Sequence, residues 1–163
     1  MTRLLYLDFD GVLHPEDVYR RPQIGPSLGL TALAGHRLFE HAGRLAELLA
    51  PHSDVSIVLS TTWVRLLGYR AARERLPLAL AQRVVGATFH SRMDRTLFIQ
   101  LDRGQQVVAD AARRQPRDWV ALDDDCDGWP RHGRGRLIQT DGVLGLATPG
   151  ADSALSDWLL NKL

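Results

Sequence analysis

Two aspartates in the segment LLYLDFDGVLHP, residues 4–15, have a spacing suited to holding a cation. Asp8 and Asp10 follow an apolar run and stand two positions apart, so in an extended chain both side chains point to the same side. Carboxylates that share a pocket repel each other unless something compensates their charge. Oxygen-only ligands favour Mg²⁺, which keeps several waters and accepts phosphate oxygens of a substrate. The alternative is an ordinary turn after a strand, which Gly11 would also suit.

Two more groups of polar residues follow apolar segments. Ser60 and Thr61 come at the end of the segment 54–60, and three consecutive acids end the segment 118–125: Asp123, Asp124 and Asp125. In parallel α/β sheets, ligands bind outside the carboxyl ends of the strands. We therefore expect these groups to converge with the first pair of aspartates. Taken alone, each has a simpler interpretation, as strand-end polar residues or as a solvated acidic loop.

Strand patterns alternate with helix patterns along the chain. Apolar and β-branched runs predict strands at residues 3–9, 54–60, 83–88, 118–125 and 135–140. Apolar periodicity predicts helices at 36–50, 103–115 and 152–163, with a mixed and mostly helical region at 64–82 around Pro77. The Gly- and Pro-rich segment 11–29 predicts an irregular flap. The alternation predicts an α/β, three-layer Rossmann-like fold with a central parallel sheet of about five strands.

Composition is that of an ordinary globular protein. The 163 residues are 45% hydrophobic and 24% charged, and this length favours one domain spanning residues 1–163. No apolar run approaches the ~20 residues that span a bilayer, and no leader pattern is present, so we expect a cytoplasmic protein. A net charge of +1 gives little support to nucleic-acid or membrane binding. Nineteen of the twenty basic residues are arginine, Lys162 being the exception.

The motifs resemble those of the haloacid dehalogenase-like (HAD) phosphohydrolases. The stretch DFDGVL fits the first signature of that superfamily, and the later motifs follow in the expected order: SIVL ending in Ser60, Arg103 opening a helix, and VALDDD. The VLHP start, the TTW after the second motif and the RG of the third resemble small members without a cap domain. These include HAD domains associated with bacterial RNA-repair proteins.

The resemblance implies definite catalytic roles. Asp8 would be the nucleophile that forms an aspartyl-phosphate, and Asp10 would be the general acid and then the general base. Ser60, or Thr61 beside it, would hydrogen-bond the transferring phosphoryl group. Gly11 belongs to the same implied phosphate-binding set.

A positive charge is expected in the third motif, where HAD proteins more commonly carry lysine. Arg103 is the expected residue here, to neutralise the phosphoryl group and orient Asp8. Because arginine is planar and bidentate, it is not equivalent to a lysine point charge. Arg92 and Arg95 are the alternatives.

A metal site is implied by the same resemblance. Asp124, with Asp123 beside it, would hold Mg²⁺ together with Asp8 and the carbonyl of Asp10. Which of the three acids from Asp123 to Asp125 binds the metal stays open at this point.

The expected activity is Mg²⁺-dependent hydrolysis of a phosphomonoester. Only about 20 residues separate Arg103 from Asp123, enough for one helix and a strand, so an open site without a large cap is expected. An open site suits a large substrate such as a nucleic-acid phosphate end, or broad phosphoesters. The alternatives are a 5′-nucleotidase or small-metabolite phosphatase, and a non-catalytic phosphate- or metal-binding module that acts with a partner.

Three features near these motifs leave their roles open. His14 either touches substrate or fixes the flap. Trp63 is either a core residue or a platform on which a base stacks. The basic segment 131–136 either contacts phosphates or is a solvated loop.

Overall fold

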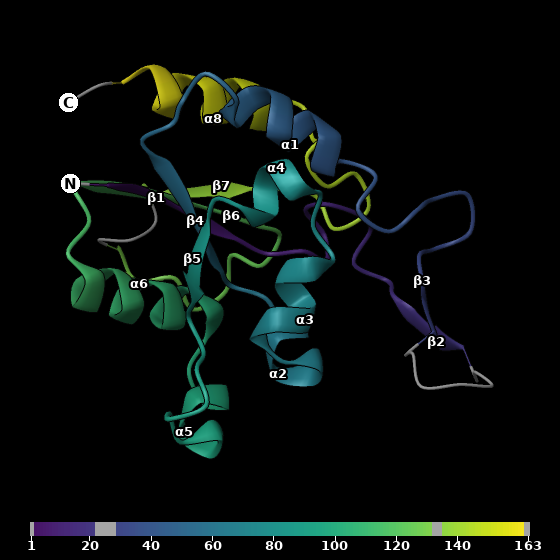
Figure 1. Ribbon diagram of the computed structural model, residues 1–163, viewed down its shortest axis with the longest axis horizontal. Helices are drawn as coiled ribbons and strands as arrows, with labels where there is room; N and C mark the ends of the chain where they lie inside the picture. The colour runs from purple at the N-terminus through teal and green to yellow at the C-terminus, as the bar shows by residue number, and fades with distance from the viewer. Residues whose placement is uncertain (1, 22–28, 132–134, 162–163) are drawn as a thin grey trace.

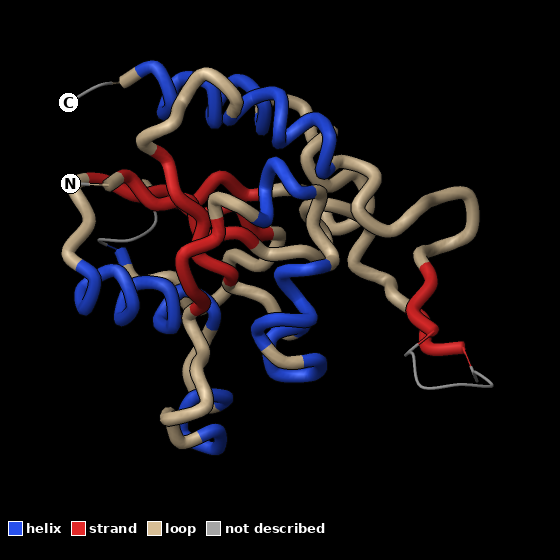
Figure 2. Tube along the Cα trace, in the orientation of Figure 1, coloured by secondary structure: helices blue, strands red, loops and turns tan. Residues whose placement is uncertain are grey.

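A five-stranded parallel sheet forms the centre of the molecule (Figures 1 and 2). The computed structural model describes residues 2–21, 29–131 and 135–161. The strands are β1 (Arg3–Leu7), β4 (Val55–Leu59), β5 (Val84–Ala87), β6 (Asp118–Asp123) and β7 (Leu137–Gln139), in the order β5-β4-β1-β6-β7. All four pairings are parallel. The predicted α/β fold and strand count are confirmed.

The register of β1 decides where the polar residues meet. Leu7 pairs with Leu59 on one side and with Leu122 on the other. Because the strands are parallel, the residue after each of these leucines stands at the same carboxyl edge of the sheet. These residues are Asp8, Ser60 and Asp123.

Helices cover both faces of the sheet. α1 (Ala42–Leu49) and α8 (Ala151–Leu160) lie over one face and α6 (Arg103–Arg114) lies over the other (Figure 1). Alternate residues of β1 point to opposite faces: Leu5 and Leu7 join the core under α1 and α8, whereas Leu4 and Tyr6 pack toward α6. A strand with both faces covered explains the uninterrupted apolar run at the N-terminus.

Three short helices fill the connection from β4 to β5, where a mixed helical region was predicted. They are α2 (Trp63–Leu67), α3 (Tyr69–Glu74) and α4 (Leu78–Ala81). Gly68, with φ of +89°, separates the first two, and Pro77 is the N-cap of the third.

Some predicted boundaries were wrong. The helix predicted at 36–50 begins only at Ala42, because Phe39 has φ of +61°, which a right-handed helix excludes. The predicted irregular flap, residues 11–29, includes strand β2 (Tyr19–Arg21), which pairs antiparallel with β3 (Gly29–Thr31) at the end of the flap; this two-stranded sheet projects from the body (Figure 1). Helix α5 (Arg95–Ile99), capped by Asp94, was also missed. Each has five residues or fewer, too few for periodicity to register.

The carboxyl edge carries no inserted domain within the described parts of the chain. The stretch between Arg103 and Asp123 forms only α6 and β6, so the prediction of no large cap is confirmed. Residues 22–28 of the flap and 132–134 of the basic segment 131–136 lie outside the described residues. None of the described helices is both long and apolar enough to span a membrane.

Candidate active site

Asp8 lies at the end of β1, at the centre of the carboxyl edge, and is 5% exposed. Its Oδ1 accepts a hydrogen bond from the backbone amide of Phe9 at 2.7 Å. Its Oδ2 lies 2.9 Å from Nη1 of Arg103. Burial raises the pKa of Asp8, and the guanidinium of Arg103 opposes that shift. The carboxylate is therefore held by the Phe9 amide and the Arg103 guanidinium, and the Thr61 hydroxyl adds a third contact.

Arg103 reaches Asp8 because it is the first residue of α6, whose N-terminus is held by a capping box. Its Nη1 also donates to the carbonyl of Ser60 and lies 3.3 Å from Oδ2 of Asp123. One nitrogen makes all three contacts, and neither Nη2 nor Nε has a protein partner among the described residues. Arg92 and Arg95, the alternative cations, are exposed and make no ion pair with the described acids.

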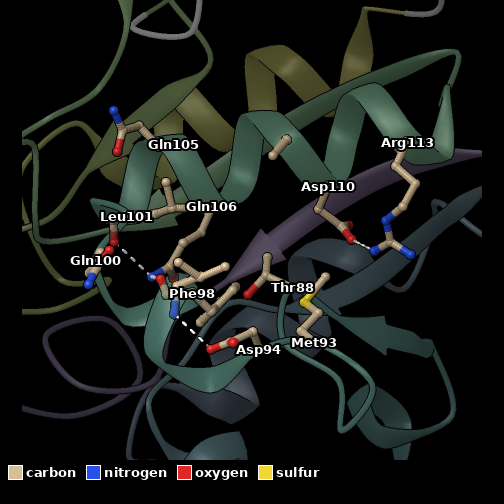
Figure 3. A pocket seen from close by; sticks show the side chains of 12 residues that line it. Thr88, Met93, Asp94, Phe98, Gln100, Leu101, Gln105, Gln106, Asp110 and Arg113 are labelled. Carbon is tan, nitrogen blue, oxygen red and sulfur yellow. Dashed lines mark hydrogen bonds and ion pairs between the residues drawn. The ribbon is translucent and has the colours of Figure 1, made fainter.

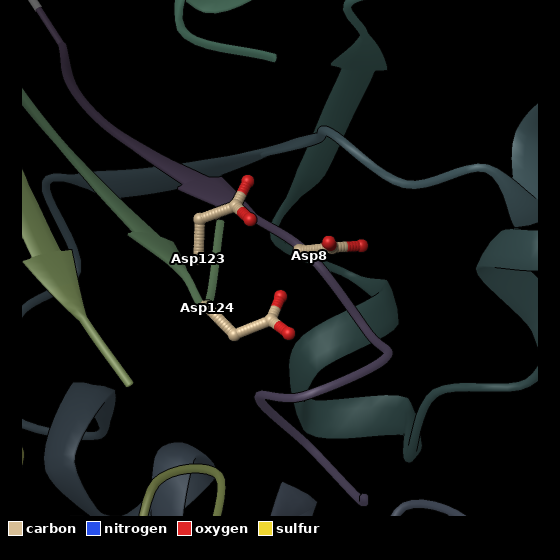
Figure 4. A group of neighbouring side chains, drawn as sticks. All are labelled: Asp8, Asp123 and Asp124. Carbon is tan, nitrogen blue, oxygen red and sulfur yellow. The ribbon is translucent and has the colours of Figure 1, made fainter. Parts of the chain in front are cut away.

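Three carboxylates gather beside this arginine. Asp8, Asp123 and Asp124 each offer one oxygen, and these oxygens lie within 4.8 Å of one another (Figure 4). Burial, followed by the charge of Asp8, raises the pKa of Asp123 to about 8 and that of Asp124 to about 6. Asp125 stands outside the group, because it is exposed and its Oδ1 accepts from the amide of Asp127 at 2.8 Å.

The acidic group has the chemistry of a site for a hard divalent cation. All its donors are oxygens, and burial together with the charge of Asp8 raises the pKa of Asp123 and Asp124, so a bound cation would offset the repulsion among them. Gly11 leaves space for the side chain of Asp124. It has φ of +71° and lies so close to the Asp124 carboxyl group that a Cβ at position 11 would collide with it. The amide of Gly11 donates to the carbonyl of His14 at 2.9 Å. The amide of Gly11 is therefore already paired within the protein and does not point to a phosphate. The role that the structure shows for Gly11 is the space it leaves beside Asp124.

The end of β4 supplies the other wall of the site. Ser60 is 2% exposed, and its hydroxyl oxygen is buried with no hydrogen-bond partner among the described residues. A buried hydroxyl without a partner is uncommon, since leaving it unsatisfied costs about 1–3 kcal/mol. The Thr61 hydroxyl hydrogen-bonds Asp8 and accepts from the amide of Trp63 at 3.3 Å. The Ser60 hydroxyl thus has an unsatisfied hydrogen bond at this edge of the sheet.

The family of the chain follows from a comparison with known proteins. A family model described as the HAD domain in Swiss Army Knife RNA repair proteins matches residues 4–151. The chain belongs to this family. The match runs from β1 to the first residue of α8, so it covers every strand of the central sheet. No curated protein and no solved structure matched the chain. Membership of this family supports a HAD-type phosphohydrolase in general.

Asp10 of this HAD domain lies two residues beyond Asp8 and is held by two side chains. Nε2 of His14 and Nε1 of Trp63 each lie 2.9 Å from Oδ1 of Asp10. His14 is fully buried, so it does not touch substrate. Trp63 is 2% exposed and packs among aromatic rings, so the hypothesis that it stacks on a base is wrong. The sequence alone did not connect either residue to Asp10.

A separate cavity lies away from this site. It has a volume of about 750 Å³ and opens between α5 and α6 (Figure 3). Its walls include Phe98 and Leu101 from one side and Asp110 and Arg113 from the other. None of the predicted catalytic residues lines it, so we assign no catalytic role to it.

Proposed function

We propose that residues 1–163 form a single HAD domain that hydrolyses phosphomonoesters with Mg²⁺ through an aspartyl-phosphate on Asp8. The observation that carries this proposal is the surroundings of Asp8. A cation, a partnerless buried hydroxyl and two more carboxylates meet around one fixed carboxylate at the open edge of the sheet. Phosphoryl transfer needs positioning and charge neutralisation above all, and this arrangement supplies both.

Substrate binding uses Ser60 and Arg103. The Ser60 hydroxyl donates to an oxygen of the phosphoryl group, which satisfies a hydroxyl that otherwise has no partner. Arg103 keeps Nη1 on Asp8 and turns its remaining N–H groups to the phosphoryl oxygens, which suits the planar fork of arginine. In this way Arg103 both orients Asp8 and neutralises the phosphoryl group, the two functions expected of the cation in the third motif.

The reaction proceeds in two steps. An oxygen of Asp8 attacks phosphorus, so that a P–O bond to Asp8 forms and the bond to the leaving oxygen breaks, while Asp10 protonates that oxygen. Water then attacks the phosphorus of the acyl phosphate and gives its proton to Asp10. Inorganic phosphate leaves and the carboxylate of Asp8 is restored.

Asp8, Asp123, Asp124 and the Asp10 carbonyl would hold the metal. Bound Mg²⁺ offsets repulsion between the anionic nucleophile and the anionic substrate. The all-oxygen donor set and the space left by Gly11 fit that ion.

The open edge and a neighbouring arginine favour a substrate that carries a second phosphate, such as an RNA or DNA end. Arg65 of α2 is half-buried and has no acidic partner among the described residues. Burial and the positive charges of Arg103 and Arg95 lower its pKa, so a second anion would stabilise this region. The family name, with its reference to RNA repair, supports the same substrate class. A small-metabolite phosphatase or 5′-nucleotidase is the rival.

Turnover of p-nitrophenyl phosphate with Mg²⁺ or with EDTA tests the proposal. We expect Mg²⁺-dependent activity in the wild type and a loss of at least about 10³-fold in Asp8→Asn, because the amide cannot act as nucleophile. Equal rates in the two proteins would overturn the hydrolase and favour a non-catalytic binding module. Faster release of phosphate from a 3′-phosphorylated oligonucleotide than from nucleoside monophosphates would support the nucleic-acid substrate, and the reverse order would favour the rival.

A further inference from the structure

The two oxygens of Asp10 have different surroundings. Oδ1 faces two N–H donors, from His14 and Trp63, each at 2.9 Å. Oδ2 has no partner among the described residues, and the side chain is 27% exposed. An oxygen that faces two N–H donors has no direction left for a proton of its own. A proton on Asp10 therefore has to sit on Oδ2, the oxygen open to the site.

The hydrogen bond from His14 depends on its tautomer, which a third residue determines. The backbone amide of Phe39 donates to Nδ1 of His14 at 3.1 Å. With Nδ1 accepting, the proton of the neutral ring lies on Nε2, which therefore donates to Asp10. Phe39 presents its amide from a left-handed conformation, with φ of +61°. This conformation is unfavourable for a residue with a bulky side chain, and such strain concentrates at functional sites.

Packing keeps both donors in place. The rings of Phe9, Phe39 and Trp63 lie in mutual edge contact, with centroids 5.2 to 5.8 Å apart. The His14 ring packs on two of them, 5.0 Å from Phe39 and 5.7 Å from Trp63. Neither donor can turn away from Asp10 without disturbing this buried cluster.

We propose that His14 and Trp63 are positioning residues that hold Asp10 by Oδ1, so that Oδ2 alone gives the proton to the leaving oxygen and takes it from water. This inference rests on the proposed function, because it assigns the acid and base of that reaction to one oxygen. It predicts that the pair matters most when the leaving group needs a proton.

Trp63→Phe tests the inference because it removes the indole N–H and keeps an aromatic ring in the buried cluster. The smaller ring also loses packing, and Trp158→Phe is the control for that loss: it makes the same change in ring size and deletes an indole hydrogen bond to Asp118 at the N-terminal end of β6, away from the site. We compare kcat/KM for p-nitrophenyl phosphate, whose leaving group departs unprotonated, with that for glycerol 2-phosphate, whose alkoxide needs a proton. A general acid contributes about 10²–10⁴-fold, so we expect Trp63→Phe to lose about 10-fold or more on glycerol 2-phosphate and less than about 3-fold on p-nitrophenyl phosphate.

Two variants of His14 separate its two contacts. In His14→Gln the amide nitrogen can take the place of Nε2 and donate to Asp10, whereas the shorter Asn in His14→Asn can serve only the position of Nδ1. We expect the Gln variant to retain more activity on glycerol 2-phosphate than the Asn variant, and thermal melts verify that both are folded.

Three results would overturn the inference. The first is an equal loss of kcat/KM on both substrates in Trp63→Phe. The second is a loss of kcat/KM in Trp63→Phe that is no larger than in Trp158→Phe. The third is a set of ¹⁵N NMR shifts that put the proton of His14 on Nδ1. The NMR measurement needs no activity. A wild type without Mg²⁺-dependent turnover would instead overturn the proposed function, so the two failures are distinguishable.

Discussion

Removing Mg²⁺ should make the stability of this HAD domain fall as the pH rises from about 5 to about 8. Burial, followed by the charge of Asp8, raises the pKa of Asp123 to about 8 and that of Asp124 to about 6, against an ordinary value of 3.8. Between the unfolded and the folded pKa, the folded protein holds a proton that the unfolded chain has released. Stability is therefore fully present below the unfolded pKa and is lost as the pH rises through the folded one.

The size and shape of the loss follow from the two values. Each group that titrates in this way removes at most about 1.4 kcal/mol per pH unit. Asp124 contributes to this loss of stability up to about pH 6, and Asp123 contributes to it up to about pH 8. After allowance for relaxation of the site, we expect on the order of 1 kcal/mol per pH unit, with a steeper slope below about pH 6 than above it.

Mg²⁺ should reverse this trend, because it binds the deprotonated carboxylates that proton release creates. At a free concentration about 100 times its Kd, it would add about 2.7 kcal/mol, and less at low pH where protons compete. Urea unfolding in EDTA and in Mg²⁺, at several pH values, gives both slopes.

Two neighbouring acids provide a matched comparison. Asp123→Asn removes a buried carboxylate of the acidic group, whereas Asp125→Asn makes the same charge change on an exposed residue outside that group. We expect the Asp123 variant to be more stable than the wild type near pH 8 without metal, and to gain nothing from Mg²⁺. The Asp125 variant should behave as the wild type. A metal-free stability that stays level or rises with pH, or an Mg²⁺ effect that survives Asp123→Asn, would show that these carboxylates neither hold raised pKa values nor bind the metal.

Gly11→Ala should lower stability by about 1–2 kcal/mol and weaken Mg²⁺ binding, since its φ is positive and the added Cβ meets the carboxyl group of Asp124; a calorimetric Mg²⁺ titration equal to that of the wild type would contradict this. Arg103→Ala should destabilise the protein by about 3–5 kcal/mol near neutral pH, because it leaves the buried Asp8 without its cation. Arg103→Lys should recover most of that stability in urea unfolding, and equal instability of both variants would argue against an electrostatic role.

The positions of the main site residues could be predicted because each follows a strand. Asp8, Ser60 and Asp123 come directly after apolar runs, and parallel pairing brings such positions to one edge. Arg103 could be predicted from its place at the start of a helix that follows the motif order. These are local signals, and the register of the sheet turns them into proximity.

The support of Asp10 could not be predicted, because it depends on contacts between distant parts of the chain. Trp63 lies 53 residues from Asp10, and the amide of Phe39 lies 25 residues from His14. No periodicity shows that Phe39 adopts a positive φ, and an indole N–H leaves no signature in an apolar pattern. The exclusion of Asp125 from the acidic group also depends on where β6 ends, which the run of acids conceals.

Trapping the phosphoryl group on Asp8 tests directly whether this residue is the nucleophile. The protein is mixed with substrate and Mg²⁺, quenched, and reduced with borohydride, which converts an aspartyl-phosphate to homoserine, and the peptides are then read by mass spectrometry. We expect homoserine at position 8 in the wild type and none in Asp8→Asn. Substrate turnover with homoserine at another position, or with no homoserine when the quench is faster than turnover, would show that Asp8 is not the nucleophile.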